Sequence, residues 1–221
     1  MTRKIICILL LTTGLFVLTS KSCEPDIDMD EEARLKAEQE STLKEIKNEF
    51  ESEYLFEDRL MAYGEKAKQK LVDFTDYLSL YSGKDLDTLF RQQVKDMIYK
   101  LFYEKDAMIQ LSVVLADNTG DKENNLTGLL SGIEASNYQS IGFAISDQKI
   151  IEPLHLESTE RYTGKIGCCF RISGITEKDT TLLSETINQV KMIATRISKQ
   201  FGDETSLQVW QVFLYDIETI K

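Results

Sequence analysis

The chain has 221 residues and a formal net charge of −11. This acidic balance argues against nucleic acid as a partner, because phosphates require clusters of lysine and arginine, and against electrostatic attachment to anionic lipids. The length is sufficient for one domain with a hydrophobic core and an additional stalk.

The first 23 residues have the pattern of a secretory leader. Arg3 and Lys4 give it a basic start, residues 5–18 form an apolar run, and a short polar segment leads to Cys23. A helix that spans the hydrocarbon of a bilayer needs about 20 apolar residues. Because the run is shorter, residues 1–22 are predicted to be a cleaved signal peptide rather than a permanent anchor.

This segment resembles the leader of bacterial lipoproteins, in which a peptidase cuts just before a cysteine that carries a diacylglyceryl group. Ser22 suits such a cut, whereas Ser20 stands where these leaders usually carry a large aliphatic residue. The resemblance implies lipid attachment at Cys23; an ordinary leader with a chance cysteine is the alternative. Acyl chains such as palmitate would anchor the protein to a membrane, since each buried methylene contributes about 0.8 kcal/mol.

An acidic segment follows the predicted cut. Within residues 23–32 there are six acids and no base: Glu24, Asp26, Asp28, Asp30, Glu31 and Glu32. Such a block repels itself and stays extended and solvated, so residues 23–32 are predicted to be a tether. The block also resembles signals that bring some Gram-negative lipoproteins to the outer face of the outer membrane. The expected location is therefore the cell envelope, at the outer membrane of a Gram-negative bacterium, on its periplasmic or outer face.

Residues 33–82 are predicted to be helical. Within 55–82, apolar or small residues recur at alternating spacings of four and three, which places them along one side of a helix: Leu60, Gly64, Ala67, Leu71, Phe74, Leu78 and Tyr81. This seam is expected either to pack against a neighbouring element or to form a coiled coil with a second chain. Gly64 and the incomplete heptads favour packing within the chain.

Residues 83–221 are predicted to form an α+β domain. A wide apolar stripe over 86–102 indicates a helix that lies across a sheet. Alternating patterns then predict strands within 107–115, 126–133, 138–145, 149–156 and 161–173. Residues 183–201 carry apolar side chains at helical spacing, and 206–217 alternate again. The predicted fold thus has N-terminal helices, an antiparallel sheet of about five to six strands, and one long helix before the C-terminal strand.

From 85 to 201 the order of elements resembles a GAF- or PAS-type sensor domain. The segments that carry this resemblance are LDTLFRQQVKDMIYKLF, AMIQLSVVLAD, YTGKIGCCFRISG and LLSETINQVKMIATRISKQF. The resemblance implies a module that binds a small ligand or a partner, but no ligand-binding residue of these families can be placed. A cystatin-like cone, in which helices nest in a curled sheet, is the alternative, and it requires a strand at 183–201.

The sequence carries few signs of catalytic chemistry. It contains no glycine-rich phosphate loop, no H-E-x-x-H and no G-x-S-x-G. Cys168 and Cys169 are neighbours on a predicted strand and point to opposite faces, so we expect Cys168 in the core and Cys169 as a free thiol on the other face. With a single histidine, His155, a zinc site is not expected, and no cofactor is indicated.

Three residues remain as candidate ligand contacts. Arg161 and Arg171 carry guanidinium groups that can fork onto an anionic ligand. His155 is expected to be an ordinary imidazole at the rim or in the core of the domain, with a general base as the less favoured alternative.

These observations favour a non-enzymatic envelope lipoprotein. It would contact the membrane through its lipidated N-terminus and bind a small ligand or an envelope protein through its α+β domain, with no role for nucleic acid. One alternative is an oligomeric scaffold that associates through the seam at 60–81. Another is a carboxylate-dependent hydrolase, which would need a convergent pair of acids in a deep pocket near His155.

Overall fold

The computed structural model describes residues 34–38, 41, 54–111, 124–201 and 205–220. The chain divides into two units, residues 1–48 and residues 49–221. The described residues of the first unit, 34–38 and 41, are helical. The predicted signal peptide, Cys23 and the acidic tether lie outside the described residues.

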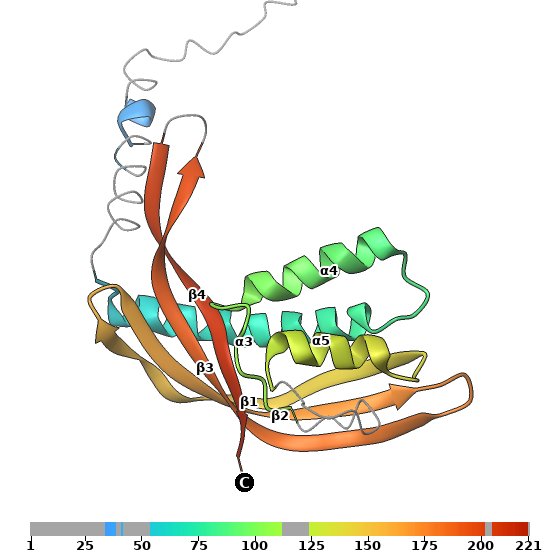
Figure 1. The fold of residues 1–221 in the computed structure, drawn as a ribbon. Coiled ribbons are helices and arrows are strands. Elements are labelled where there is room, and N and C mark those ends of the chain that lie inside the picture. The colour runs from blue at the N-terminus through green and yellow to red at the C-terminus, as the bar shows by residue number, and fades with distance from the viewer. Residues whose placement is uncertain (1–33, 39–40, 42–53, 112–123, 202–204, 221) are drawn as a thin grey trace, which may run out of the picture. The chain divides into compact units, whose positions relative to one another are not determined.

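The second unit has three helices and four strands within its described ranges (Figure 1). The helices are α3 (Glu57–Tyr81), α4 (Thr88–Leu101) and α5 (Leu126–Ala135), and the strands are β1 (Ser140–Ser158), β2 (Arg161–Ile175), β3 (Thr180–Phe201) and β4 (Thr205–Thr219). Each strand pairs antiparallel with the next, in the order β1-β2-β3-β4. The predicted α+β class is confirmed, but the described sheet has four strands instead of five to six.

The predicted long helix over 183–201 is wrong, because these residues belong to β3. Its residues at 0% exposure follow a period of two, namely Asn188, Val190, Met192 and Ala194, and Ile193 between them is buried as well. Many of its other residues are β-branched, and such side chains lose rotamer freedom in a helix but pack well on a sheet. A strand at this position is what the cystatin-like alternative required, whereas the GAF- or PAS-type arrangement required a helix.

Two further strand predictions are also wrong. Residues 126–133 form most of α5, where the side chain of Asn125 caps the helix by accepting a hydrogen bond from the amide of Gly128 at 2.7 Å. The described part of the predicted strand at 107–115 makes single bridges, from Met108 to Asn125 and from Ile109 to Ile217, rather than a continuous ladder. Residues 112–115 lie outside the described ranges.

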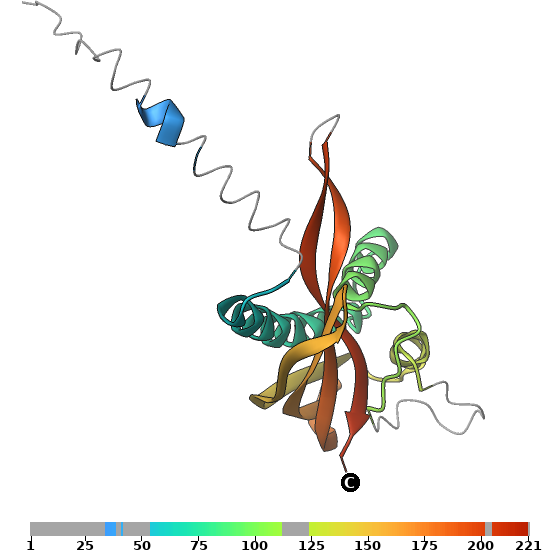
Figure 2. The same ribbon diagram turned by 90° about the vertical axis from the view of Figure 1, so that its left-hand side faces the viewer.

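The helix that crosses the sheet is α3, and not the segment 86–102 as predicted. It packs against β1 and β4, while α4 packs on α3 (Figures 1 and 2). Its seam is buried from Gly64 to Tyr81, with Ala67, Leu71, Phe74 and Leu78 at 0% exposure, while Leu60 is partly buried. The seam at 60–81 is thus used within the chain, which is the intramolecular alternative, and little of its apolar surface is left for a second chain.

The C-terminal end of α3 is fixed to two neighbours. Tyr81 donates a hydrogen bond to the carboxylate of Glu134 in α5, and burial together with this bond raises the pKa of Tyr81. Toward β1, the hydroxyl of Ser82 accepts a hydrogen bond from the amide of Ile141 at 2.8 Å, and the hydroxyl of Ser79 accepts one from the amide of Phe143 at 2.9 Å. These two serines therefore satisfy backbone donors of β1, which among the described strands has β2 alone as a neighbour.

Candidate functional site

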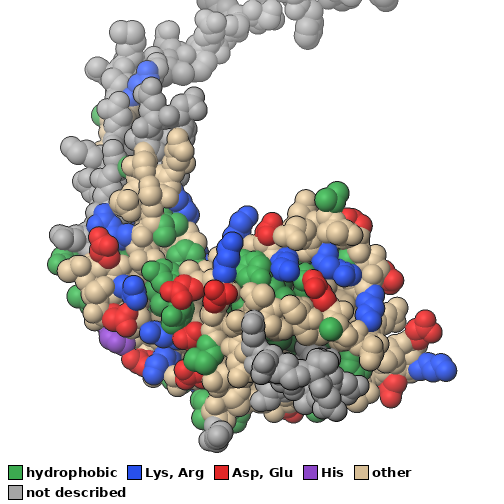
Figure 3. Space-filling model, viewed as in Figure 1, with side chains coloured by type: hydrophobic (Ala, Val, Ile, Leu, Met, Phe, Trp, Pro, Cys, Tyr) green, Lys and Arg blue, Asp and Glu red, His purple; other side chains and the backbone are tan. Residues whose placement is uncertain are grey.

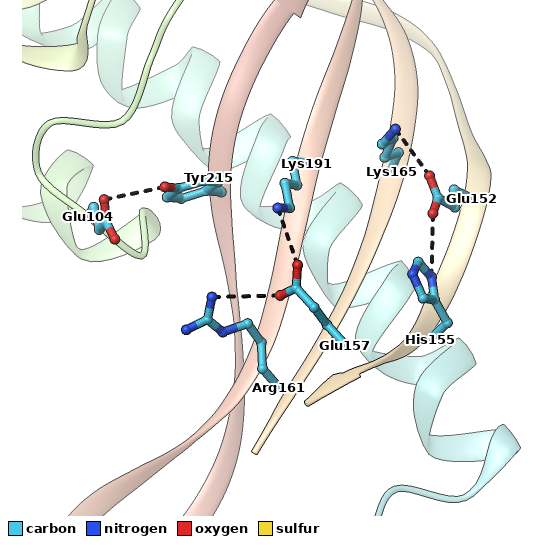
Figure 4. A network of polar contacts seen from close by, with 8 residues as sticks. All are labelled: Glu104, Glu152, His155, Glu157, Arg161, Lys165, Lys191 and Tyr215. Atoms are coloured by element: carbon cyan, nitrogen blue, oxygen red, sulfur yellow. Dashed lines mark hydrogen bonds and ion pairs between the residues drawn. The ribbon is translucent and has the colours of Figure 1, made fainter. Parts of the chain in front are cut away.

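The sheet has one face packed on the helices and one face turned outward. In β2, Ile166, Phe170 and Ile172 are buried, whereas Lys165 is partly exposed and Arg171 is exposed. This is expected when successive side chains point to opposite faces. Figure 4 shows a network of charged side chains in front of the strands, with α3 behind them. In Figure 3, acidic and basic side chains lie next to one another around the histidine.

A carboxylate between two cations lies at the centre of this network. Glu157, near the end of β1, is 3.6 Å from Nη1 of Arg161 on β2 and 3.8 Å from Nζ of Lys191 on β3. Roughly a third to two fifths of each side chain is exposed. Exposed ion pairs of this length contribute little to stability, so these contacts are not what holds the strands together.

Aromatic rings hold the two cations in place. The guanidinium of Arg161 lies 5.5 Å from the centre of the Tyr103 ring, and Nζ of Lys191 lies 5.4 Å from the centre of the Tyr215 ring, distances typical of cation–π contacts. Tyr103 packs edge-to-face against Tyr215 and Phe213, at 6.1 Å in both pairs. We refer to Tyr103, Arg161, Lys191, Phe213 and Tyr215 as the cation–aromatic cluster.

The backbone brings Tyr103 to this face although it comes from outside the sheet. The amide of Tyr103 donates to the carbonyl of Leu214 at 2.8 Å, and the preceding residue, Phe102, is buried in the core at 4% exposure. Because neighbouring residues of an extended chain point in opposite directions, the buried Phe102 sends the Tyr103 ring outward. Tyr103 is therefore anchored beside β4 rather than carried by a free loop.

Negative charge borders the cluster at Tyr215. Its hydroxyl lies 3.4 Å from Oε2 of Glu104. Burial, followed by the carboxylates of Glu104 and Asp216, raises the pKa of Tyr215, while Arg161 opposes this shift. The phenol therefore stays neutral at neutral pH and donates its hydrogen bond to Glu104.

His155 lies in a separate part of the network. Its Nδ1 is 3.5 Å from Oε1 of Glu152 and 3.2 Å from the carbonyl of Pro153, and Lys165 approaches the other oxygen of Glu152 at 3.3 Å. The histidine side chain is 54% exposed and that of Glu152 is 40% exposed. These exposed groups do not provide the buried, convergent pair of acids that the hydrolase hypothesis requires.

The three candidate ligand contacts do not form one site. Arg161 and His155 both lie near the turn between β1 and β2, pairing with Ser158 and Thr163, but His155 is not part of the cation–aromatic cluster. Arg171 lies ten residues further along β2, or about 33 Å at the usual rise of a strand. There it pairs with Glu185 at 2.7 Å, and this hydrogen bond and charge raise the pKa of Arg171.

The two cysteines confirm the expectation drawn from their alternation. Both are free; Cys168 is buried and Cys169 is partly exposed. Burial raises the pKa of the Cys168 thiol to about 12. Within the described residues, no group of three or more His, Cys, Asp and Glu side chains is arranged to hold a metal ion.

Comparison with protein-family models, with curated proteins and with solved structures found no match for this chain. In the ranges that the structure describes, no helix combines the length and apolar character needed to cross a bilayer.

Proposed function

We propose that the protein is a non-enzymatic envelope lipoprotein that binds a protein partner through the cation–aromatic cluster. Its leader pattern and the acidic segment at 23–32 support attachment at the outer membrane of a Gram-negative bacterium, on the periplasmic or outer face, through acyl chains on Cys23. The observation that carries the binding proposal is the gathering of two tyrosines, a phenylalanine and an arginine on the outer face of the sheet.

The composition of the cluster favours a protein over a small ligand. Tyrosine and arginine are enriched among the residues that dominate binding energy at protein interfaces. Small-ligand sites are instead concave, and apolar residues form most of their lining. Here the rings and cations lie on the outer side of a sheet and remain partly exposed, as an interface requires. The rings also pre-order the long side chains of Arg161 and Lys191, which reduces the entropy lost on binding.

The anchoring part of the proposal is tested with a Cys23→Ser variant expressed from its own leader. The wild-type chain is expected in the membrane fraction, with a mass that corresponds to cleavage before Cys23 and added acyl chains. The variant is expected to lose both properties. Retention of the variant in the same fraction with an unmodified mass would refute the anchoring.

The binding part is tested by affinity capture from envelope extracts with matched variants of the full mature chain. Wild type and Arg171→Ala are expected to capture the same partner, whereas Arg161→Ala and Tyr103→Ala are expected to lose it. Arg171 is a suitable control because it is an arginine on the same strand and face, far from the cluster. If all four chains capture the same proteins, or none, the cluster is not the binding site.

A further inference from the structure

We propose that Arg161 and Lys191 form a receptor for an acidic side chain of the protein partner, and that Glu157 occupies this receptor in the free protein. This inference builds on the proposed function and names the chemistry of the group that is recognised. In the complex, an aspartate or glutamate of the partner would replace Glu157 between the two cations, next to the rings of Tyr103 and Tyr215.

The distances indicate that Glu157 satisfies neither cation well. Charge-assisted hydrogen bonds between nitrogen and carboxylate oxygen are typically about 2.7–2.9 Å long, whereas Glu157 lies 3.6 Å from Arg161 and 3.8 Å from Lys191. On the same face of the sheet, Arg171 and Glu185 meet at 2.7 Å. The sheet can therefore support a close ion pair, and the pairs at Glu157 are loose by comparison.

The backbone at Glu157 favours its release. Leu156 pairs with Tyr162 and Ser158 pairs with Arg161, so Glu157 is the additional residue of a bulge next to the turn between β1 and β2. Its side chain can turn toward solvent without disturbing the ladder. The two cations would remain in place, because the rings of Tyr103 and Tyr215 hold them.

The two cations approach one carboxylate from neighbouring strands, which suits a single acidic group. Arg161 offers a planar fork of donors and Lys191 a point charge. The chain as a whole carries a net charge of −11, so a strongly acidic partner would be repelled at long range. The receptor therefore suits a partner that presents an isolated aspartate or glutamate on a surface that is not acidic overall.

The test is an NMR titration of the full mature chain with a capped peptide that carries a single glutamate, N-acetyl-Ala-Glu-Ala amide, followed at the side-chain Nε–H of Arg161. Wild type is expected to show saturable shifts. Glu157→Gln is expected to bind the peptide about two- to fivefold more tightly, which is the range expected when an exposed ion pair no longer competes. In Arg161→Gln the titration is followed at the side chain of the neighbouring Lys191, and the shift that the peptide causes there in wild type is expected to be lost.

Glu185→Gln provides the matched control, because it also removes one negative charge from the same face but leaves the cluster untouched. It is expected to bind the peptide as wild type does. Equal tightening by Glu185→Gln and Glu157→Gln would indicate a general charge effect and overturn the proposal, as would no tightening by Glu157→Gln. A parallel titration with inorganic phosphate distinguishes the ligand class, and saturation by phosphate without any response to the peptide would also overturn it.

The outcome of this titration is separate from that of the capture experiment. The peptide probes the receptor without the natural partner. If Arg161→Ala loses the captured partner but the titration fails, the cluster is still the protein-binding surface and only the acidic receptor is refuted. A successful titration with no partner captured would support the receptor and count against the proposed protein-binding function.

Discussion

Replacing Gly164 by alanine tests how the sheet presents the charged network. Gly164 faces the helices at a point where β1 is irregular, and an added Cβ would lie 2.6 Å from Cε of Met192, 2.7 Å from the carbonyl oxygen of Glu152 and 3.0 Å from the amide nitrogen of Leu154. Two of these three atoms belong to the backbone and cannot rotate away. Overpacking of this kind costs about 1–3 kcal/mol, and the backbone contacts place Gly164→Ala near the upper end.

Gly64→Ala is the matched control. Its added Cβ would come within 2.7 Å of Cδ1 of Ile150, which is the far end of a partly buried side chain and can move. Alanine also favours the helical backbone over glycine by about 0.5–1 kcal/mol. The two effects oppose each other, so the free energy of unfolding of Gly64→Ala is expected to stay within about 1 kcal/mol of wild type.

Urea unfolding and thermal unfolding, both followed by far-UV circular dichroism, give the free energy of unfolding and the Tm of both variants. A loss of about 3 kcal/mol in Gly164→Ala should lower Tm by about 6–12 °C for a domain of this size. Because the clash involves the backbone of Glu152 and Leu154, the NMR signal of His155 should move as well. The reasoning is refuted if Gly164→Ala is as stable as wild type, or if Gly64→Ala loses as much stability as Gly164→Ala.

Three other predictions concern the edge of the sheet, the thiols and a buried phenol. Replacing Ser79 and Ser82 together by alanine leaves two amides of β1 without their acceptors, and we expect a loss of about 1–3 kcal/mol in the free energy of unfolding per unsatisfied buried group. Because the edge strand can then pair with another chain, we also expect association, which light scattering detects as the protein concentration rises. Cys169 should react with a maleimide in the folded chain, whereas Cys168 should react only after unfolding, because Cys168 is buried and has a pKa of about 12. Tandem mass spectrometry locates the label, and equal labelling of both thiols would contradict the assigned faces. The pKa of Tyr81 is raised above its ordinary value of 10.0, so its contribution to stability is complete below pH 10 and is lost as pH rises through the folded-state pKa. The free energy of unfolding of wild type should therefore fall more steeply above pH 10 than that of Tyr81→Phe. Parallel curves for the two proteins would refute this.

Helices α3 and α4 and strand β2 were largely predictable because their burial follows from local spacing, whereas α5 was mistaken for a strand. The seam from Leu60 to Tyr81 predicted α3 and its buried side, and the alternation in 161–173 predicted β2, which the structure extends to Ile175. The segment 183–201 was not predictable in this way, because its apolar residues satisfy a helical spacing as well as a strand. These residues form a strand because they pair with β2 on one side and with β4 on the other. A single sequence does not reveal such distant contacts.

The candidate site was predictable only in part, for the same reason. Arg161 was singled out because its guanidinium can fork onto an anionic ligand, but Lys191 was hidden by the predicted helix. Tyr103 gave no signal, since its position depends on a backbone hydrogen bond to Leu214, far along the chain. Phe213 and Tyr215 could be assigned to one face of a strand by alternation, yet the identity of their neighbours required the fold.

Irregular pairing in the sheet is what assembles the charged and aromatic groups. In a regular ladder each residue faces one partner, but Glu157 is the additional residue of a bulge in β1. Lys191 lies at a second irregularity, since Val190 pairs with Ile217 and Met192 with Leu214, so two residues of β4 stand opposite one residue of β3. Bulges redirect side chains and are frequent next to functional sites. The two bulges lie on different strand pairs. They bring the releasable carboxylate of Glu157 and the ring-held cation of Lys191 to one place, whereas a uniform sheet of the same composition would keep these groups apart.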